Sequence, residues 1–168
     1  MGSADEIVTI VDERNQPVGT ASRRRVRAER LIHRATYILV FDSRGRLFIQ
    51  KRTPDKDIYP GYYDAAAGGV VRAGESYEES AAREAEEELG IRNTPLTDHF
   101  DFYFEDEGDR VWGRVFSCVH DEPFALQEEE IESGEFMDLD EVLKGKVKPL
   151  TPDTLLALSR YLRNRKLP

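Results

Sequence analysis

Alternation of apolar and polar residues along much of the chain predicts short β-strands joined by turns. Turns at Gly45 and Gly108 each separate two such runs, which is the pattern of a β-hairpin. Another turn, at residues 15–17, ends the first run, and residues 63–67 predict a short additional strand. The main predicted strands are residues 7–11, 36–41, 47–50, 99–105 and 110–119.

Helical spacing replaces this alternation between residues 77 and 89. Ser76 is followed three residues later by Glu79, which is the spacing of a capping box at a helix N-terminus. Gly90 stands where a left-handed C-cap belongs. The sequence therefore predicts a helix over residues 77–89.

Two further helices are predicted nearer the ends of the chain. Ser22 precedes a basic segment, residues 23–27, and can cap a short helix there. Pro152 and Asp153 open an amphipathic C-terminal helix over residues 152–166. Its apolar residues at helical spacing are Leu155, Leu158 and Leu162.

The connecting segments are rich in proline, glycine or acidic residues. Pro54 and the pair Pro60-Gly61 mark a long loop, and residues 124–134 predict an acidic loop. Strands mixed with a few helices, without regular alternation of the two, predict an α+β fold with a mixed sheet. With 168 residues, the chain is expected to form a single domain over residues 1–168, in which residues 5–32 are an N-terminal strand segment.

Composition narrows the classes of partner. The chain has 33 acidic and 24 basic side chains and a formal net charge of −9, which argues against nucleic acid and anionic membranes. No apolar run approaches the roughly 20 residues of a membrane span, and a signal-peptide pattern is missing. The single cysteine, Cys118, rules out an internal disulfide. We expect it to be a buried filler in a protein of the cytoplasm.

Three carboxylates give the predicted central helix its candidate chemistry. They fall within about 100° of one helix face: Glu84, Glu87 and Glu88. Ala82, Ala85 and Leu89 are expected roughly opposite, where they would let the helix pack closely. The carboxylates repel one another and lie near the negative end of the helix dipole. Either they form a solvated acidic face, or a divalent cation neutralises them and attracts phosphate.

The spacing of fixed residues around this helix carries a family resemblance. The fixed positions are Gly69, Glu75, Arg83-Glu84-Ala85, Glu87-Glu88 and Gly90-Ile91. Residues 69–91 resemble the Nudix box, GX5EX7REUXEEXGU with U aliphatic, although Ala85 is small for a U position. Flanking similarity, from about Ile7 to Leu143, resembles the branch that contains isopentenyl-diphosphate isomerases and YfcD-like Nudix hydrolases.

The resemblance implies an α/β/α sandwich around a mixed β-sheet, with the box forming a loop, a helix and a loop. It also implies a bound divalent cation, Mg²⁺ or Mn²⁺. The implied metal ligands are Gly68, through its carbonyl, Glu84, Glu87 and Glu88. The residues implied to maintain the shape of the box are Gly69, Glu75, Arg83 and Gly90. Among these, Glu75 and Arg83 are expected to form an ion pair.

The implied activity is hydrolysis of a diphosphate linkage in a nucleoside diphosphate derivative or a similar organic diphosphate. Water would attack phosphorus, with Glu84 as the first candidate for the general base and Glu87 as a second catalytic carboxylate. The other candidate base is Glu129 or Glu130 of the acidic loop. The expected partner is therefore a small-molecule diphosphate, and a homodimer stays open.

Residues outside the box are candidate substrate contacts. Arg52 and Lys56 align with isomerase residues that contact the substrate diphosphate. Trp112 is the best candidate for stacking on a nucleobase, because Gly113 would leave space beside its ring. His33 aligns near a metal-site histidine of isomerases, but we expect it to have a structural role.

Two alternative functions are weighed against hydrolysis. Isopentenyl-diphosphate isomerases have Cys and His where this chain has Gly68 and Val70, and their later acidic residues are replaced around residues 111–114. The proton donors and acceptors of isomerisation are thus missing. A non-catalytic nucleotide-binding module is the other alternative, but binding alone does not require so many carboxylates.

Overall fold

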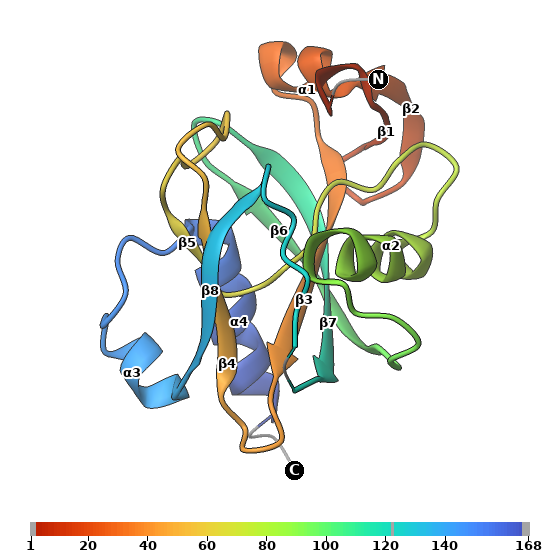
Figure 1. The fold of residues 1–168 in the computed structure, drawn as a ribbon. Coiled ribbons are helices and arrows are strands. Elements are labelled where there is room, and N and C mark those ends of the chain that lie inside the picture. The colour runs from red at the N-terminus through yellow and green to blue at the C-terminus, as the bar shows by residue number, and fades with distance from the viewer. Residues whose placement is uncertain (1–2, 122, 166–168) are drawn as a thin grey trace.

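Strand β3 (His33–Phe41) is the centre of the sheet in the computed structural model of the protein (Figure 1). The strand is largely apolar and buried, as expected for a strand that is covered on both faces. Strand β7 (Arg110–Val119) pairs in parallel with each of the nine residues of β3. The structure describes residues 3–121 and 123–165.

Six further strands and four helices complete the described part of the chain. The strands are β1 (Ile7–Val11), β2 (Pro17–Ser22), β4 (Leu47–Arg52), β5 (Tyr63–Asp64), β6 (Thr97–Glu105) and β8 (Ile131–Met137). The helices are α1 (Arg23–Glu29), α2 (Tyr77–Leu89), α3 (Leu139–Leu143) and α4 (Pro152–Arg165), preceded by a 3-10 turn at Ser3–Asp5. Both predicted hairpins and the predicted central helix are confirmed.

Three segments share the other edge of β3. Strand β1 pairs antiparallel with its start, and β4 with its end. Between them, the segment after β5 forms bridges from Ala67 to Ile38 and from Val70 to Ala35. Strand β4 then diverges from β3 and pairs antiparallel with β5 and β8. The parallel β3–β7 pair among antiparallel neighbours confirms a mixed sheet.

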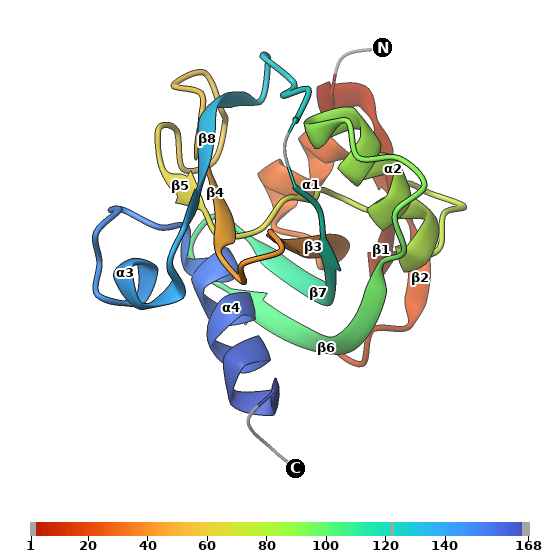
Figure 2. The ribbon, with the colours of Figure 1, turned by 60° about the horizontal axis from the view of Figure 1, so that its bottom comes forward.

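Side chains of β3 alternate between two apolar layers. Tyr37 and Leu39 belong to the cluster that includes Leu158 of α4, whereas Ile38 and Val40 belong to the cluster that includes Leu89 of α2. Figures 1 and 2 show α2 and α4 on opposite sides of β3. This arrangement confirms the predicted α/β/α sandwich, because each helix buries its apolar side against one face of the same sheet.

The ends of α2 are fixed by the residues that predicted them. The Ser76 hydroxyl accepts a hydrogen bond from the Glu79 amide at 3.0 Å, and the Glu79 carboxylate accepts one from the Ser76 amide at 3.3 Å. Gly90 has a φ of 72° and donates its amide to the Glu86 carbonyl at 2.9 Å. The capping box and the left-handed C-cap are therefore both present.

The buried side of α2 differs from the expected one. Ala82 is exposed, and the buried residues are Tyr77, Ser80, Ala81, Ala85, Glu88 and Leu89. The acidic arc therefore borders the buried side instead of lying opposite to it. Glu88 falls inside the buried side, and Glu84 lies at its edge.

Two loop predictions require correction. The acidic loop over residues 124–134 is wrong in its second half, because β8 begins at Ile131 and pairs with β4. In β8 only Ile131 and Met137, at its two ends, are buried, and the residues between them are mostly exposed and include acidic side chains. The sequence therefore lacks the apolar alternation that predicts a strand. The strand expected over residues 63–67 is restricted to Tyr63–Asp64.

The terminal helices agree with the sequence. The Ser22 hydroxyl caps α1 by accepting from the Arg25 amide at 3.2 Å. Helix α4 spans Pro152–Arg165, and residue 166, the last of the predicted helix, lies outside the described residues. Cys118 is buried, as expected. Among the described residues, no helix has the length and hydrophobicity of a membrane span.

Gly113 of β7 gives a test of core packing. A Cβ atom at this position would lie 2.6 Å from Tyr37 Cε2 and 2.7 Å from Phe102 Cε1. The expectation that Gly113 leaves space beside Trp112 is therefore wrong, because aromatic rings fill that space. We expect Gly113→Ala to lower the free energy of unfolding by about 1–3 kcal/mol through overpacking, as measured by urea denaturation.

Gly19→Ala is the matched control for this substitution. Gly19 lies on a strand, and a Cβ atom there would meet nothing within 4 Å. Its free energy of unfolding should change little. Equal stability of the two variants would show that the core around Gly113 can accommodate a methyl group.

Candidate active site

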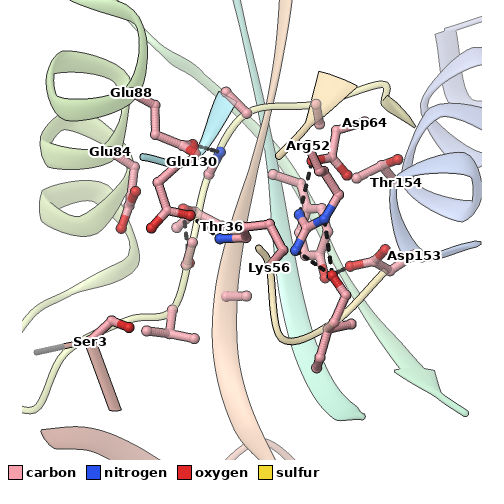
Figure 3. A pocket seen from close by; sticks show the side chains of 18 of the residues that line it. Ser3, Thr36, Arg52, Lys56, Asp64, Glu84, Glu88, Glu130, Asp153 and Thr154 are labelled. Atoms are coloured by element: carbon pink, nitrogen blue, oxygen red, sulfur yellow. Dashed lines mark hydrogen bonds and ion pairs between the residues drawn. The ribbon is translucent and has the colours of Figure 1, made fainter. Parts of the chain in front are cut away.

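A cavity of about 300 Å³ opens between α1, β3, β4, α2 and the start of α4. Nine residues singled out from the sequence line it: Arg52, Lys56, Gly68, Gly69, Arg83, Glu84, Glu87, Glu88 and Glu130. Figure 3 shows Glu84, Glu88 and Glu130 on one side, Lys56 in the middle, and Arg52, Asp64, Asp153 and Thr154 on the other side. A concave site with converging polar groups is the usual form of a small-molecule site.

Two glycines bring the loop before α2 close to β3 and to the helix. Gly68 has a φ of 141°, and a Cβ atom there would collide with the carbonyl oxygen of Thr36. A Cβ atom on Gly69 would lie 2.6 Å from Glu84 Oε1. Gly68 is therefore required for the close approach of this loop to β3, whereas a side chain at Gly69 would displace the Glu84 carboxylate.

Glu88 is the most deeply buried carboxylate of the box. It is 7% exposed, and its Oε1 accepts a hydrogen bond from the Gly68 amide at 2.7 Å. Burial, with a smaller contribution from the Glu84 carboxylate, raises the pKa of Glu88 to about 8. Burial also raises the pKa of Glu84, against the opposing effect of Arg83. A cation in the cavity would stabilise the ionised form of both groups.

Arg83 connects the acidic residues of the box. Its guanidinium donates to both oxygens of Glu75, at 2.7 and 3.0 Å, and so forms the ion pair expected from the sequence. The same guanidinium donates to Glu84 at 2.8 Å and to Glu87 at 3.1 Å. Arg83 thereby fixes the loop that holds Glu75 against α2 and partly neutralises two of the candidate metal ligands.

Lys56 and Arg52 lie in the cavity but already have protein partners. Lys56 forms an ion pair with Glu130, and burial lowers the pKa of its ammonium group. Arg52 donates to the Ile58 carbonyl at 2.8 Å and to Asp64 Oδ2 at 3.0 Å. Contact of either residue with a substrate diphosphate stays a prediction.

The side of the cavity that faces away from the box was not predicted. Its polar residues are Tyr37, Gln50, Asp64, Asp153 and Thr154. Tyr37 donates its hydroxyl to Asp153 Oδ2 at 2.8 Å, which couples β3 to the start of α4. In the sequence, the sign of this side of the cavity was a polar residue directly after an apolar run, as at Gln50 after Leu47–Ile49. Such a pattern alone does not identify a site.

The N-terminal segment also contributes to the cavity. Glu6, Arg23 and Arg27 line it, although sequence reasoning assigned them no role in the site. Arg23 Nη1 lies 3.8 Å from Glu6 Oε1, whereas Arg27 forms ion pairs with Asp57 and Asp109, each at 3.3 Å. These residues come together only because β1 pairs with β3.

His33 and Trp112 occupy different environments. His33 lines the cavity, and burial lowers its pKa although its Nε2 lies 3.6 Å from Asp109 Oδ1. Trp112 lies outside this cavity, in a second hollow beside Tyr77, and its ring contacts Tyr103 with centroids 5.5 Å apart. The structure therefore does not bring Trp112 together with the box carboxylates.

The box residues fit a divalent cation in chemistry. Glu84 and Glu88 are carboxylates at the edge of a polar cavity, and hard oxygen ligands suit Mg²⁺ or Mn²⁺. Within residues 3–121 and 123–165, no three acidic, histidine or cysteine side chains form a preassembled metal cluster. Mg²⁺ commonly uses only one or two carboxylates, together with waters and substrate phosphate, so this geometry is compatible with it.

The sequence was compared with models of known protein families. Residues 31–158 match the model of the NUDIX domain. The chain belongs to the Nudix family. It is a Nudix hydrolase, and its box lies inside the matched region.

Related proteins agree with this assignment. The chain is 54% identical to a Nudix hydrolase of Yersinia pestis over 94% of this chain and 86% of the relative. It is 49% identical to the Nudix hydrolase YfcD of Escherichia coli strain K12, over 98% and 91% of the two chains. The crystal structure of DR0079 from Deinococcus radiodurans has a TM-score of 0.71 and 28% identity, covering 83% and 87%. The predicted YfcD-like relationship is thus confirmed.

Asp153 gives a pH-dependent test of the unpredicted side of the site. Burial raises its pKa to about 6, so the folded state favours the protonated carboxyl. Ionising Asp153 costs more in the folded protein than in the unfolded chain. The free energy of unfolding therefore falls as pH rises from about 4 to above 6. Asp153→Asn keeps an acceptor for Tyr37 without the charge, and we expect it to increase the free energy of unfolding by about 2 kcal/mol at pH 8.

Thermal unfolding at pH 4 and pH 8 measures this effect. The gain from Asp153→Asn should shrink towards pH 4, where the native carboxyl is itself neutral. Asp138→Asn is the control, because Asp138 is exposed and makes no side-chain capping bond to α3. The same gain at both pH values would exclude ionisation of Asp153 as its cause.

Proposed function

We propose that this Nudix hydrolase cleaves a diphosphate linkage in a nucleoside diphosphate derivative or a similar organic diphosphate, in a reaction that requires Mg²⁺ or Mn²⁺. Water attacks phosphorus. The observation that supports this most strongly is that the buried Glu88 and the half-buried Glu84 line one cavity that also contains Lys56. A bound cation would stabilise the ionised form of these two acids, whose pKa values are raised, and would let an anionic substrate enter an acidic protein.

Glu84, Glu87 and Glu88, with the carbonyl of Gly68, would hold the metal. The bound ion would neutralise charge on the diphosphate and favour ionisation of the attacking water. The chain itself positions these ligands through the capped helix α2 and through Arg83. Preorganised charge of this kind, rather than covalent chemistry, is the main requirement of phosphoryl transfer.

The remaining residues divide between proton transfer and substrate binding. Glu84 is our first candidate for the general base, and Glu130, which lies on the same side of the cavity as Glu84 in Figure 3, is the second. Lys56 is placed to bind a phosphate oxygen when substrate displaces Glu130 from it. Arg52 supports the wall beside it through Asp64 and Ile58.

A solved relative supports a small-molecule substrate. The NUDIX domain of Shewanella oneidensis NrtR was crystallised with ADP ribose, and its structure has a TM-score of 0.63 to this chain at 13% identity, covering 80% of this chain and 88% of that one. At this identity the comparison concerns the fold alone. We extend to this chain only the binding of a small diphosphate, and retain a nucleobase-stacking role for Trp112 as a prediction.

The wider properties of the protein follow from the same proposal. We infer a cytoplasmic enzyme without nucleic-acid or membrane partners, in keeping with its net charge of −9 and its buried free thiol. We also infer one domain over residues 1–168, in which the segment 5–32 contributes Glu6, Arg23 and Arg27 to the cavity and α4 (Pro152–Arg165) is the C-terminal helix. A homodimer stays a prediction, as does the relation to isopentenyl-diphosphate isomerases.

Two glutamates on α2 provide a matched test of catalysis. Glu87 lines the cavity, whereas Glu86 is exposed, does not line it, and pairs with Arg92 at 3.1 Å. We expect Glu87→Gln to reduce turnover of a hydrolysed diphosphate by about 100-fold or more, since it removes a charge that stabilises the reacting phosphate. Glu86→Gln should retain turnover within about twofold.

The assay measures phosphate release and product masses from a panel of organic diphosphates with Mg²⁺ or Mn²⁺. Full turnover by Glu87→Gln would remove this carboxylate from the mechanism. Proton exchange into isopentenyl diphosphate without cleavage would instead support the isomerase. Saturable binding without turnover across the whole panel would support the non-catalytic module.

Removal of the metal is a separate test. Treatment with EDTA should abolish hydrolysis, and added Mg²⁺ or Mn²⁺ should restore it, because the carboxylates alone repel the substrate. Calorimetry should detect binding of the metal to the native protein and weaker binding to Glu88→Gln. If neither ion binds, with or without a phosphorylated ligand, the metal-dependent proposal is wrong.

A further inference from the structure

Gln50 is a buried polar residue whose side chain has no protein partner. It is 4% exposed and lies at the end of the apolar run of β4. Within residues 3–121 and 123–165, its carboxamide makes no hydrogen bond, although it lines the cavity. The carboxamide is not sealed from solvent, because the buried polar atom without a partner among the described residues is Trp112 Nε1, so the Gln50 amide meets the open space of the cavity. An amide free of protein partners within the described residues therefore lies at the wall of the candidate active site.

The register of the sheet places Gln50 beside the side of the cavity that faces away from the box. Gln50 lies opposite Asp64 in the antiparallel β4–β5 pair, so both side chains project from the same face. Asp64 accepts from Arg52 at 3.0 Å and from the Thr151 hydroxyl at 2.7 Å. In Figure 3, Asp64 and Arg52 are grouped with Asp153, away from Glu84 and Glu88.

The chemistry of this group differs from that of the box. Asp64 and Asp153 are acceptors when ionised, and the Gln50 amide offers two donor hydrogens and an acceptor oxygen. A phosphate group is disfavoured here, because it would face two carboxylates, and the nearby cations Arg52 and Lys56 are already engaged by protein partners. A hydroxyl group is suitable, since it can donate to a carboxylate and accept from the amide at the same time.

We propose that Gln50 selects the organic part of the substrate, by hydrogen bonding to a hydroxyl group on a moiety that is linked to the diphosphate. This inference rests on the proposed function, and it names the substrate class as hydroxylated organic diphosphates. Substrates with a purely hydrocarbon moiety are rejected, because they leave the Gln50 amide unpaired in the closed complex. A site built around hydrogen bonds discriminates strongly against analogues that lack the bonding group.

The test uses Gln50→Met and two diphosphates of equal size. Met has a similar volume and no amide. The probes are 4-hydroxybutyl diphosphate and pentyl diphosphate, each with the metal that supports activity. The native enzyme should hydrolyse the hydroxylated probe with a kcat/KM at least about tenfold higher. In Gln50→Met, the ratio of kcat/KM between the two probes should be close to one, because kcat/KM for the hydroxylated probe falls.

Stability separates selection from a structural role. Because Gln50 has no protein hydrogen bond to lose, Gln50→Met should leave the Tm unchanged or raise it by a few degrees. Gln16→Met is the matched control, since Gln16 is exposed and does not line this cavity. It should leave both the probe ratio and the Tm unchanged. If Gln50→Met does not fold, Gln50→Leu is measured in the same way.

Several results would overturn the inference. One is an unchanged probe ratio in Gln50→Met, and another is equal use of both probes by the native enzyme while hydrolysis itself proceeds. A fall in Tm with no change in the ratio would assign Gln50 a structural role. If neither probe is hydrolysed, calorimetry with Mg²⁺ decides: tighter binding of the hydroxylated probe, lost in Gln50→Met, supports selection by Gln50 even though the proposed hydrolysis fails. Equal binding of both probes overturns it.

Discussion

The close contact of the Gly68-Gly69 loop with β3 and α2 governs the geometry of the site. No side chain fits at Gly68 against the carbonyl of Thr36, and one at Gly69 would push the Glu84 carboxylate out of its place. Because the loop lies so close, the Gly68 amide reaches Glu88, and that carboxylate is held in a buried position. Burial in this position raises the pKa of Glu88, against the opposing effect of the Gly68 amide, so the raised pKa does not follow from acidic composition alone.

Charge is distributed within the cavity in a way that the net charge of −9 does not reveal. Basic side chains occur among the acids, but Arg83 and Arg52 are each held by carboxylates and act mainly as supports. Lys56 is also paired, through Glu130. A phosphate-bearing ligand therefore has to compete with internal partners, and a metal ion would change that balance by occupying the carboxylates.

The cavity extends beyond the region that defines the family. The NUDIX model covers residues 31–158, whereas Glu6, Arg23 and Arg27 contribute to the cavity from before that region. The Escherichia coli relative matches 98% of the chain, so its similarity includes most of this segment. Pairing of β1 with β3 and the Ser22 cap on α1 fix the segment against the core. The wall around a shared chemical centre is thus the part that can differ between family members.

The sequence by itself determined the elements with local causes. Helix α2 was predictable to the residue, because Ser76, Glu79 and Gly90 act on their own neighbours in the chain. The hairpins and the acidic arc of the box followed from similar short-range rules. Only the tertiary structure decided that β8 pairs with β4, that Glu88 is buried, and that Gln50 lies opposite Asp64 at the wall of the cavity. These features depend on strands brought together from distant parts of the chain, and residue periodicity carries no information about which distant segment becomes the neighbour.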